Sequence, residues 1–189
     1  MLRIEGGTWR GRKLESVPGD ATRPTAARLR QALFNALGPR VVDARVLDCF
    51  AGTGALGLEA LSRGAIEAVL VERAPAAQAI VERNIRALGA GDRARLVRED
   101  VWTALPRLLE TPCDGVLVDP PYRTLDWERF LAALQPGAGT GPHWVMAEHG
   151  RGETLPERVG TLVRHRHYRH GESELTFYRR EGDTSSPPG

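Results

Sequence analysis

From about residue 44 onward, short apolar runs alternate with longer stretches in which apolar residues recur at helical spacing. Short runs rich in Val and Leu predict buried strands, and recurrence every three to four residues predicts helices that cover them. This alternation is typical of a parallel sheet with helices on both faces. Strands are expected over 45–50, 68–72, 95–100, 115–119, 143–148, 159–168 and 173–178, the last two antiparallel to each other, and helices over 26–37, 55–62, 75–88, 101–109 and 127–134.

This pattern divides the chain into one α/β domain and two flanking segments. The domain is expected over 41–181, preceded by a basic extension with a helix over 1–40 and followed by a disordered tail over 182–189. Residues 1–40 carry eight basic and three acidic side chains, although the whole chain has a net charge of only +2. Arginine suits phosphate forks and stacking on unpaired bases, so the extension is a candidate polyanion-binding arm. A solvated, Arg-rich surface explains the same composition equally well.

Composition excludes several other classes. With 189 residues, of which 41% are hydrophobic, the chain is long enough for one well-buried core. No apolar stretch approaches the roughly 18 residues that span a bilayer, and the first residues lack the apolar segment of a signal peptide, so a cytoplasmic protein is expected. Cys49 and Cys113 are far apart and outside any C-x-x-C pair, which indicates neither a disulfide framework nor a zinc site.

Acidic residues close four of the expected strands. They are Asp48, Glu72, Asp100 and Asp119. Ligands of open α/β sheets bind at the carboxyl ends of the strands, so these acids are expected around one site. Taken singly, Asp100 is better explained as the N-cap of the helix that follows it.

The turn after the first strand limits the ligand to a nucleotide-like cofactor. Residues 52–57 match G-x-G-x-x-G, and Glu72 follows Gly52 by 20 residues, which fits both a nicotinamide-dependent dehydrogenase and an S-adenosylmethionine-dependent methyltransferase. Two features favour S-adenosylmethionine. Asp100 is placed to bind an adenine amine, and Asp48 with Phe50 and Ala51 can address an ammonium group rather than a pyrophosphate.

The segment Asp119-Pro120-Pro121-Tyr122 decides between these alternatives. An exocyclic base amine is a poor nucleophile, because its lone pair is delocalised into the ring. The Asp119 carboxylate and the Pro120 carbonyl are acceptors that draw the lone pair back onto nitrogen, and Tyr122 offers a face on which an extruded base stacks. In isolation the tetrapeptide also reads as a surface turn after a strand. A dehydrogenase has no use for it, so the sequence predicts a nucleic-acid methyltransferase.

Three segments resemble one known family. They are LDCFAGTGALGLEALSRGA at 47–65, Arg23-Pro24-Thr25 with RQALFN at 30–35, and the Asp-Pro-Pro-Tyr segment. Together they resemble the RsmD family of bacterial 16S ribosomal RNA guanine-N2 methyltransferases, from Ile4 to Tyr178. Cys49 and Thr53 stand where Leu and Ser are common in that family, and the region 135–142 and the strand with His165, His167 and His170 are less similar to it.

The resemblance implies a Rossmann-like methyltransferase fold with a mostly parallel seven-stranded sheet and S-adenosylmethionine as methyl donor. It implies direct transfer to a flipped-out guanine of 16S ribosomal RNA, within an assembling small subunit, by a monomer that needs no metal. The implied cofactor contacts are Asp48, Phe50, Ala51, Gly52, Thr53 and Gly54 for the methionine end, Glu72 for the ribose, and Asp100 and Val101 for the adenine. The implied catalytic residues are Asp119, Pro120 and Tyr122, and the implied RNA contacts are Arg10, Arg12, Arg23, Thr25 and Pro121.

Three other functions stay open on the residues alone. An enzyme of the same fold can methylate adenine N6 or cytosine N4 in other RNA or in DNA, although the chain has no large target-recognition domain. The others are a dehydrogenase and a non-catalytic RNA-binding assembly factor. Zinc binding by His165, His167 and His170 is disfavoured, because no carboxylate or thiol pattern accompanies them, and a surface hairpin beside RNA is expected instead.

Overall fold

A central sheet of eight strands organises the structure, a computed structural model that describes residues 1–16, 24–135, 137 and 141–183. The order across the sheet is β3-β2-β1-β4-β5-β8-β7-β6. The first five strands are parallel, and β8, β7 and β6 are antiparallel to their neighbours. The strands are β1 (Arg45–Asp48), β2 (Glu67–Val71), β3 (Ala94–Val97), β4 (Gly115–Val118), β5 (Trp144–Gly150), β6 (Arg158–Val159), β7 (Leu162–His170) and β8 (Ser173–Arg180).

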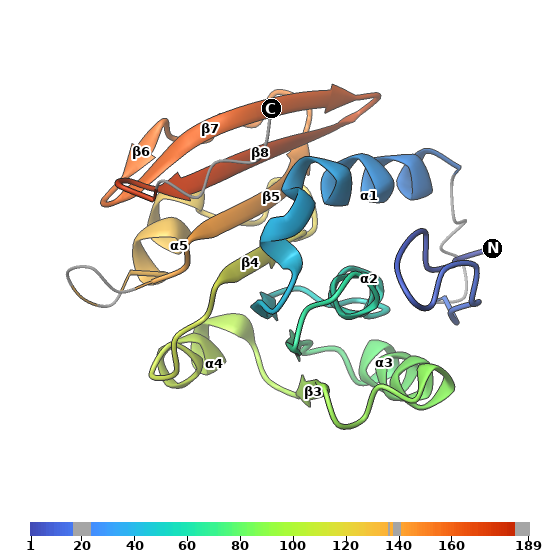
Figure 1. Cartoon of the computed structure of the whole chain (residues 1–189). Coiled ribbons are helices and arrows are strands. Elements are labelled where there is room, and N and C mark those ends of the chain that lie inside the picture. Colours follow the sequence, from blue (N-terminus) through green and yellow to red (C-terminus); the bar gives the residue numbers. More distant parts are fainter. Residues whose placement is uncertain (17–23, 136, 138–140, 184–189) are drawn as a thin grey trace.

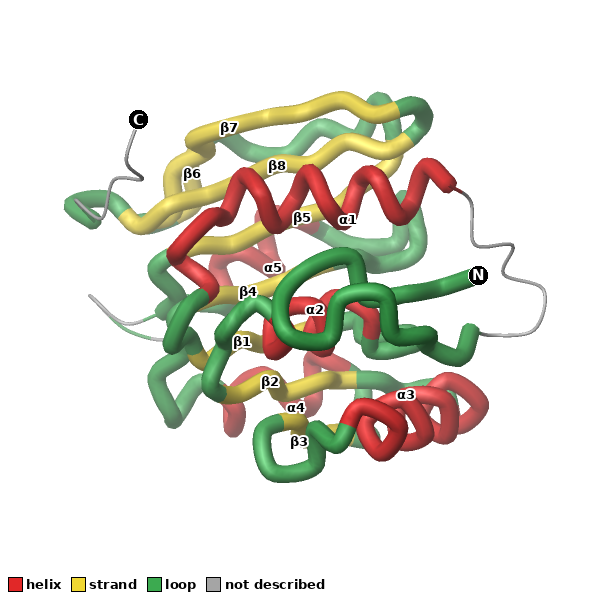
Figure 2. The backbone as a smooth tube through the Cα atoms, turned by 45° about the vertical axis from the view of Figure 1, so that its right-hand side comes forward, coloured by secondary structure: helices red, strands yellow, loops and turns green. Residues whose placement is uncertain are grey.

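Helices cover both faces of this sheet, as the alternating pattern predicts (Figure 1). The helices α1 (Pro24–Leu37), α2 (Ala55–Ser62) and α3 (Pro75–Leu88) pack on one face, with the short 3-10 helix Gly38–Val41 after α1. The helices α4 (Val101–Leu108) and α5 (Trp127–Ala133) pack on the other face. Figure 2 shows α1 lying along β5 and β8, on the side of the sheet that also carries α2.

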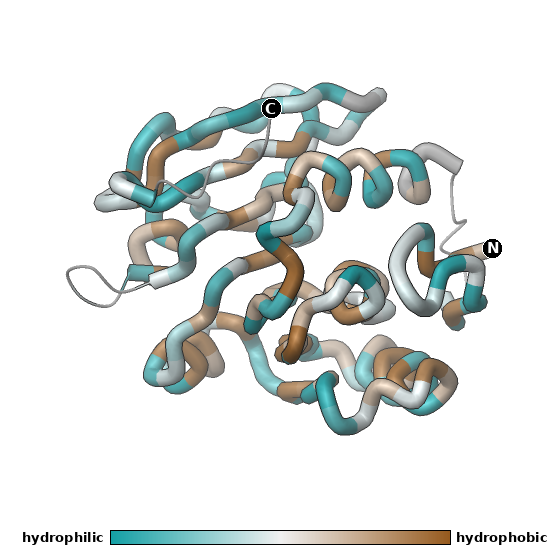
Figure 3. Tube along the Cα trace, in the orientation of Figure 1, coloured by the Kyte–Doolittle hydropathy of each residue, from teal (hydrophilic) through white to brown (hydrophobic). Residues whose placement is uncertain are grey.

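Two apolar clusters fill the space between the sheet and its helices. Alternate residues of the central strands enter different clusters: Leu117 and Met146 contribute to the α1–α3 side, and Val116 and Val145 contribute to the α4–α5 side. Both faces of these strands are therefore buried, which explains their continuous apolar runs. Figure 3 shows this hydrophobic interior and a largely hydrophilic β7 near the edge of the sheet.

The C-terminal strands differ from the prediction in number. Residues 159–168 were expected as a single strand, but Gly160 has a φ of 55°, which only a residue without a side chain adopts readily, and the chain turns there. The result is β6 before the turn and β7 after it, so the sheet has eight strands rather than seven. The antiparallel pairing of the last two long strands, β7 and β8, is confirmed.

Residues 1–16 fold back onto α2 and α3, and backbone hydrogen bonds around an isolated bridge between Arg3 and Lys13 join their two sides. Ile4 and Leu14 are buried in the same cluster as α1 and α2, so the basic extension shares the core of the α/β domain. The tail expected to be disordered lies, from residue 184 on, outside the described residues. Among the described residues, no helix is both long and apolar enough to cross a bilayer.

Candidate active site

Acidic side chains stand at the carboxyl ends of neighbouring parallel strands. Asp48 is the last residue of β1, Glu72 directly follows β2, and Asp119 directly follows β4. Asp100 lies between β3 and α4. Because these four strands are adjacent and parallel, the acids share one edge of the sheet. This is the edge at which open α/β sheets bind their ligands.

The turn between β1 and α2 leaves its backbone open to a ligand. Gly52 and Gly54 have φ values of 55° and 80°, a region that favours glycine. A Cβ on Gly52 would meet no heavy atom within 4 Å, so the turn has free space at this point. The Glu72 carboxylate anchors the turn, because Oε2 accepts the Gly52 N–H at 2.8 Å and Oε1 accepts the Ala74 N–H at 2.7 Å. The acid expected to bind a ribose thus lies beside the glycine turn.

The Asp48 side chain is fully buried, and only one of its two carboxylate oxygens has a hydrogen-bond partner in the described part of the chain. Its Oδ2 accepts the Gly57 N–H at 2.9 Å, whereas Oδ1 has no hydrogen-bond partner among the described residues. Burial raises the pKa of Asp48 to about 7 against the opposing effect of the Gly57 and Phe50 backbone N–H groups, and the charge of Glu72 adds to the rise. A buried carboxylate oxygen without a donor is costly. An incoming ammonium or N–H group would satisfy it.

Asp100 has the structural role of helix N-cap, which the sequence offered as the alternative to binding an adenine amine. It is the N-cap of α4, and its Oδ1 accepts the Trp102 N–H at 3.0 Å. Its Oδ2 lies 3.3 Å from the Arg73 guanidinium in an exposed ion pair. Val101 is buried at the start of α4. The half-buried Phe50 packs near Phe130, with ring centroids 6.0 Å apart.

The segment Asp119-Pro120-Pro121-Tyr122 leaves β4 as a turn with two unused acceptors. Within the described part of the chain, neither the Asp119 carboxylate nor the Pro120 carbonyl accepts a hydrogen bond. Pro120 is buried and Pro121 is exposed. The Tyr122 side chain is 48% exposed, and its hydroxyl lies 2.5 Å from the Ser173 hydroxyl.

Glu148 is a second carboxylate beside Asp119 that the sequence analysis left out of the site. In the β4–β5 register Val118 pairs with Ala147, so the next residues, Asp119 and Glu148, are neighbours on the same face. Burial, the facing Glu148 and then Asp48 raise the pKa of Asp119 well above its usual range. Burial also raises the pKa of Glu148, opposed by a hydrogen bond from Ser173 and the charge of Arg30. The available signal was that the fifth strand, like the others, ends in an acid.

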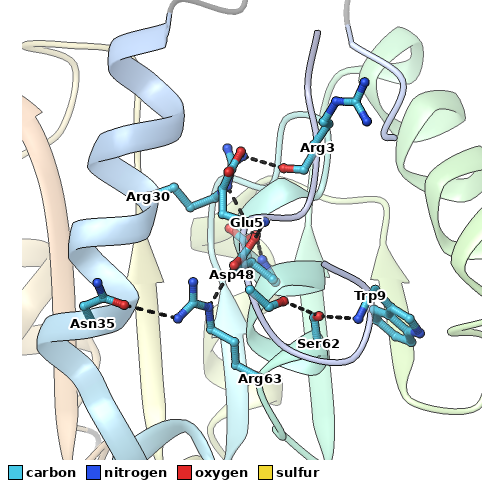
Figure 4. Close-up of polar contacts among 11 residues, drawn as sticks. Arg3, Glu5, Trp9, Arg30, Asn35, Asp48, Ser62 and Arg63 are labelled. Carbon is cyan, nitrogen blue, oxygen red and sulfur yellow. Dashed lines mark hydrogen bonds and ion pairs between the residues drawn. The ribbon is translucent and has the colours of Figure 1, made fainter. Parts of the chain in front are cut away.

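A buried ionic cluster ties α1 and the N-terminal segment to α2 beside these carboxylates (Figure 4). The fully buried Glu59 lies 2.8 Å from Arg63 and 3.6 Å from Arg30, and it accepts the Glu5 N–H at 2.7 Å. Arg30 also donates to the Arg3 carbonyl at 2.6 Å. Arg30 was counted in the basic arm, but it is 7% exposed and serves the interior.

The remaining expected RNA contacts differ in whether their side chains are already bound by other residues. Arg12 donates to the carbonyls of Ala87 and Leu88 at the end of α3, whereas Arg10 is exposed and makes no side-chain hydrogen bond or ion pair with the described residues. Thr25 lies in the first turn of α1, and only its backbone position is described. Arg23 lies outside the described residues.

Of the three C-terminal histidines, His165 is not part of the group that His167 joins, and the His170 side chain lies outside the described part of the structure. His167 instead meets His149 of β5 and Glu174 of β8, and their potential ligand atoms all lie within 4.8 Å of one another. The Thr176 hydroxyl lies between the two rings, 2.9 Å from His149 Nε2 and 3.0 Å from His167 Nδ1. His149 was missed by sequence analysis, because no local pattern links it to a residue of β7.

Comparison with known proteins gives matches over nearly the whole chain. Residues 2–179 match the family described as conserved hypothetical protein 95. The chain is 39% identical over 187 residues to ribosomal RNA small subunit methyltransferase D of Escherichia coli K12, covering 98% of this chain and 93% of that protein. It is 35% identical over 184 residues to the putative rRNA methyltransferase YlbH of Bacillus subtilis, covering 96% of this chain and all of that protein.

A solved structure shows the same fold at similar identity. The putative methyltransferase yhhF from Escherichia coli superposes with a TM-score of 0.83 at 40% sequence identity, covering 96% of this chain and 99% of that one. The predicted Rossmann-like methyltransferase class is thereby confirmed, with one more strand than expected.

Proposed function

The chain belongs to the conserved hypothetical protein 95 family, which is the RsmD family, and on this premise we propose that it methylates the exocyclic N2 amine of a guanine in 16S ribosomal RNA with S-adenosylmethionine. The methyl group passes directly to a flipped-out base. The substrate is the RNA within an assembling small ribosomal subunit, and the enzyme acts as a monomer.

One observation carries the chemistry. At the end of β4, the Asp119 carboxylate and the Pro120 carbonyl are free acceptors among the described residues, and they lie next to each other in the chain. Both can accept hydrogen bonds from one amine, which concentrates the lone pair on nitrogen. Because the pKa of Asp119 is raised, this carboxylate is also suited to take the proton that N2 loses when it becomes bonded to carbon.

Glu148 supports guanine as the base. Guanine presents two adjacent kinds of donor on its pairing edge, N1–H and N2–H₂, whereas adenine presents an acceptor at N1. A carboxylate next to Asp119 accepts from guanine N1–H and repels the adenine N1 lone pair. The pair of Asp119 and Glu148 therefore favours guanine N2 over adenine N6.

The residues of the first two strand ends fit S-adenosylmethionine. The unpartnered Asp48 Oδ1 matches the methionine ammonium, the space at Gly52 admits the cofactor beside the turn, and Glu72 retains lone pairs for ribose hydroxyls. Asp100 and Val101 face the adenine, with Phe50, Ala51, Thr53 and Gly54 completing the site. When bound, the cofactor supplies a methyl group carried on a sulfonium. As the methyl leaves, the electrons of the broken carbon–sulfur bond stay on sulfur.

The exposed residues around the turn hold the RNA. Tyr122, braced by Ser173, stacks on the flipped base beside Pro121. Arg10 and Arg12 with Arg23 and Thr25 approach the RNA from the N-terminal side. Because Arg12 already binds carbonyls of α3, Arg10 is the stronger of the two candidates for a phosphate contact.

Transfer of labelled methyl from S-adenosylmethionine to unmodified small-subunit RNA tests the proposal, with the RNA offered deproteinised and in subunit particles. Nucleoside analysis is expected to show N2-methylguanosine at one site. Label on adenine or cytosine would establish the N6 or N4 alternative. Label on DNA, or no label, would refute the ribosomal assignment.

The Asp119→Asn variant tests the catalytic assignment within the same assay. Its single-turnover rate is expected to fall by about 10²–10⁴-fold, the usual range for a lost acid–base group, with cofactor affinity unchanged. Asp126→Asn is the matched control, because Asp126 caps α5 a few residues further on and Asn caps a helix as well as Asp. Equal rates in the two variants would remove Asp119 from the chemistry.

A further inference from the structure

A cavity of about 590 Å³ opens beside the Asp119–Tyr122 turn, on the opposite face of β5 from Glu148. Its walls come from β5, β7, β8 and the loop after β5. The residues that give it its chemistry are Arg151, Arg164, Arg169, His149, His167 and Thr176, and we call this set the basic pocket.

The two carboxylates in the walls are already bound by other groups. Glu174 lies 3.2 Å from Arg169 and 3.4 Å from His167. Glu153 accepts N–H bonds from the Gly150 backbone at 2.8 Å, the Arg123 backbone at 3.1 Å and the Trp127 indole at 3.2 Å. The lining therefore keeps positive charge that these two carboxylates do not balance.

That charge belongs mainly to Arg151 and Arg164. The Arg151 side chain makes no hydrogen bond or ion pair with any described residue. Arg164 pairs at 2.6 Å with Glu157, whose side chain is 85% exposed, and exposed pairs of this kind are weak. Both guanidinium groups can turn to an anion in the cavity without breaking buried contacts.

The Thr176 hydroxyl links the two histidine rings by hydrogen bonds. His149 Nδ1 lies 3.3 Å from the Gly150 carbonyl, so a proton on Nδ1 leaves Nε2 as an acceptor. Thr176 then donates to His149 Nε2 and accepts from His167 Nδ1–H. A metal at these histidines would have to displace the Thr176 proton and overcome the nearby arginines, which favours an anion instead.

The pocket is joined to the turn that holds the base. A Cβ on Gly150 would come within 3.2 Å of the Tyr122 ring, and Glu153 binds the Arg123 N–H. A nucleotide stacked on Tyr122 therefore has a neighbouring part of its strand at the mouth of the pocket. Phosphate is the anion that such a strand carries, and arginine forks match its geometry.

We propose that the basic pocket binds a backbone phosphate of the RNA next to the methylated base. This inference rests on the proposed function. The pocket positions the strand, so its loss weakens RNA binding without altering the methyl-transfer chemistry.

The double variant Arg151→Gln/Arg164→Gln tests this site in the full chain. The control, Arg95→Gln/Arg107→Gln, removes the same charge elsewhere. Arg95 lies in β3, at the opposite edge of the sheet, and Arg107 lies in α4, the helix after β3. The pocket variant is expected to raise the RNA Kd and KM about tenfold, with kcat and cofactor affinity unchanged. Its plot of log affinity against log salt is expected to lose about 0.7 of slope for the released phosphate. Equal Kd and slope in the two variants would overturn the proposal.

Titration with inorganic phosphate separates the pocket from the proposed function. The ring signals of His149 and His167 in NMR spectra are expected to shift on addition of phosphate to the wild-type chain but not to the pocket variant. If the wild-type chain methylates no RNA and still shows these shifts, the ribosomal function fails while the anion site stands. Shifts that occur with Zn²⁺ and not with phosphate would overturn the anion site in favour of a metal.

Discussion

At the scale of single residues, three carboxylates on one face of the sheet are the central feature. Asp48 ends β1, Asp119 directly follows β4 and Glu148 lies two residues before the end of β5. Burial raises the pKa of each. The charge of Arg30 acts on Glu148, but Arg30 is already paired with Glu5 and Glu59. Such a cluster is costly in the free protein and is relieved by ligands that bring donors or positive charge.

The coupling between Asp119 and Glu148 predicts a shift in the pH profile. In the proposed mechanism Asp119 must be ionised to accept the amine, so activity is expected to rise as pH passes its elevated pKa. In Glu148→Gln the neighbouring negative charge is absent, the pKa of Asp119 falls, and the acid limb of kcat/KM is expected to move to lower pH. Overall activity on guanine falls because the N1–H acceptor is weakened.

The pH dependence of kcat/KM measures this shift, and Glu128→Gln on α5 is a control that makes the same change on an exposed side chain. An acid limb that stays in place in Glu148→Gln would show that the two carboxylates are not coupled during catalysis.

The raised pKa of Asp48 predicts that removal of its charge stabilises the folded protein and weakens cofactor binding. Its pKa rises from 3.8 to about 7 on folding, so the folded protein is stabilised when Asp48 is protonated and loses this stability as pH rises from about 4 to about 7. Asp48→Asn keeps an acceptor for the Gly57 N–H and removes the charge. At pH 8 the variant is expected to be more stable than wild type by about 2–4 kcal/mol.

Urea unfolding of the cofactor-free chain at several pH values measures this gain, and calorimetry is expected to show weaker cofactor binding. The stability gain should shrink toward pH 4. A variant whose stability follows the wild-type pH profile would contradict the assignment.

At the scale of elements, the site depends on how α1 is held over the sheet. Glu59 of α2 links Arg30 of α1, Arg63 and the Glu5 backbone. Neutralising this acid removes one of the two carboxylates paired with the buried Arg30, and the carboxylate paired with Arg63. The same cluster fixes the N-terminal segment beside the carboxylates.

Glu59→Gln is therefore expected to lower the free energy of unfolding by about 3–5 kcal/mol, the range for breaking one side of a buried ion pair. Denaturant unfolding measures the loss. Glu82→Gln, which breaks the exposed pair with Arg98, is expected to change stability by about 1 kcal/mol or less. Similar losses in both would mean that the buried cluster contributes no more than a surface pair.

Strand packing gives a second prediction at this scale. A Cβ on Gly115 of β4 would lie 1.9 Å from the buried Trp144 indole of β5, so Gly115→Ala must displace the ring. The expected loss is about 1–3 kcal/mol by thermal or denaturant unfolding. At Gly91 a Cβ meets nothing within 4 Å, and Gly91→Ala is expected to be neutral or slightly stabilising. Equal effects would show that the β4–β5 contact tolerates the added atom.

At the scale of the whole molecule, the parallel and the antiparallel strands have different proposed functions, and Ser173 links the two groups. The parallel strands β1 to β4 carry the acids proposed to hold cofactor and amine, and the antiparallel β7 and β8 form walls of the basic pocket. Ser173, at the start of β8, hydrogen-bonds to both Glu148 and Tyr122. The groups proposed for base stacking, base recognition and strand positioning therefore lie side by side.

The sequence by itself determined the parallel half of the molecule and the identity of the acids at its strand ends. Apolar runs and helical spacing are local patterns, and parallel strands joined by helices always bring their carboxyl ends to one edge. The structure accordingly has Asp48, Glu72 and Asp119 at that edge, as the sequence predicts.

Tertiary structure alone decided which side chains meet across strands distant in the chain. The placement of Glu148 beside Asp119 depends on β5 pairing with β4, and the meeting of His149 with His167 depends on β8 lying between β5 and β7. The burial of Arg30, counted as a surface charge, depends on α1 docking over Glu59. Such contacts follow from strand order and packing, and no pattern within a short segment encodes either.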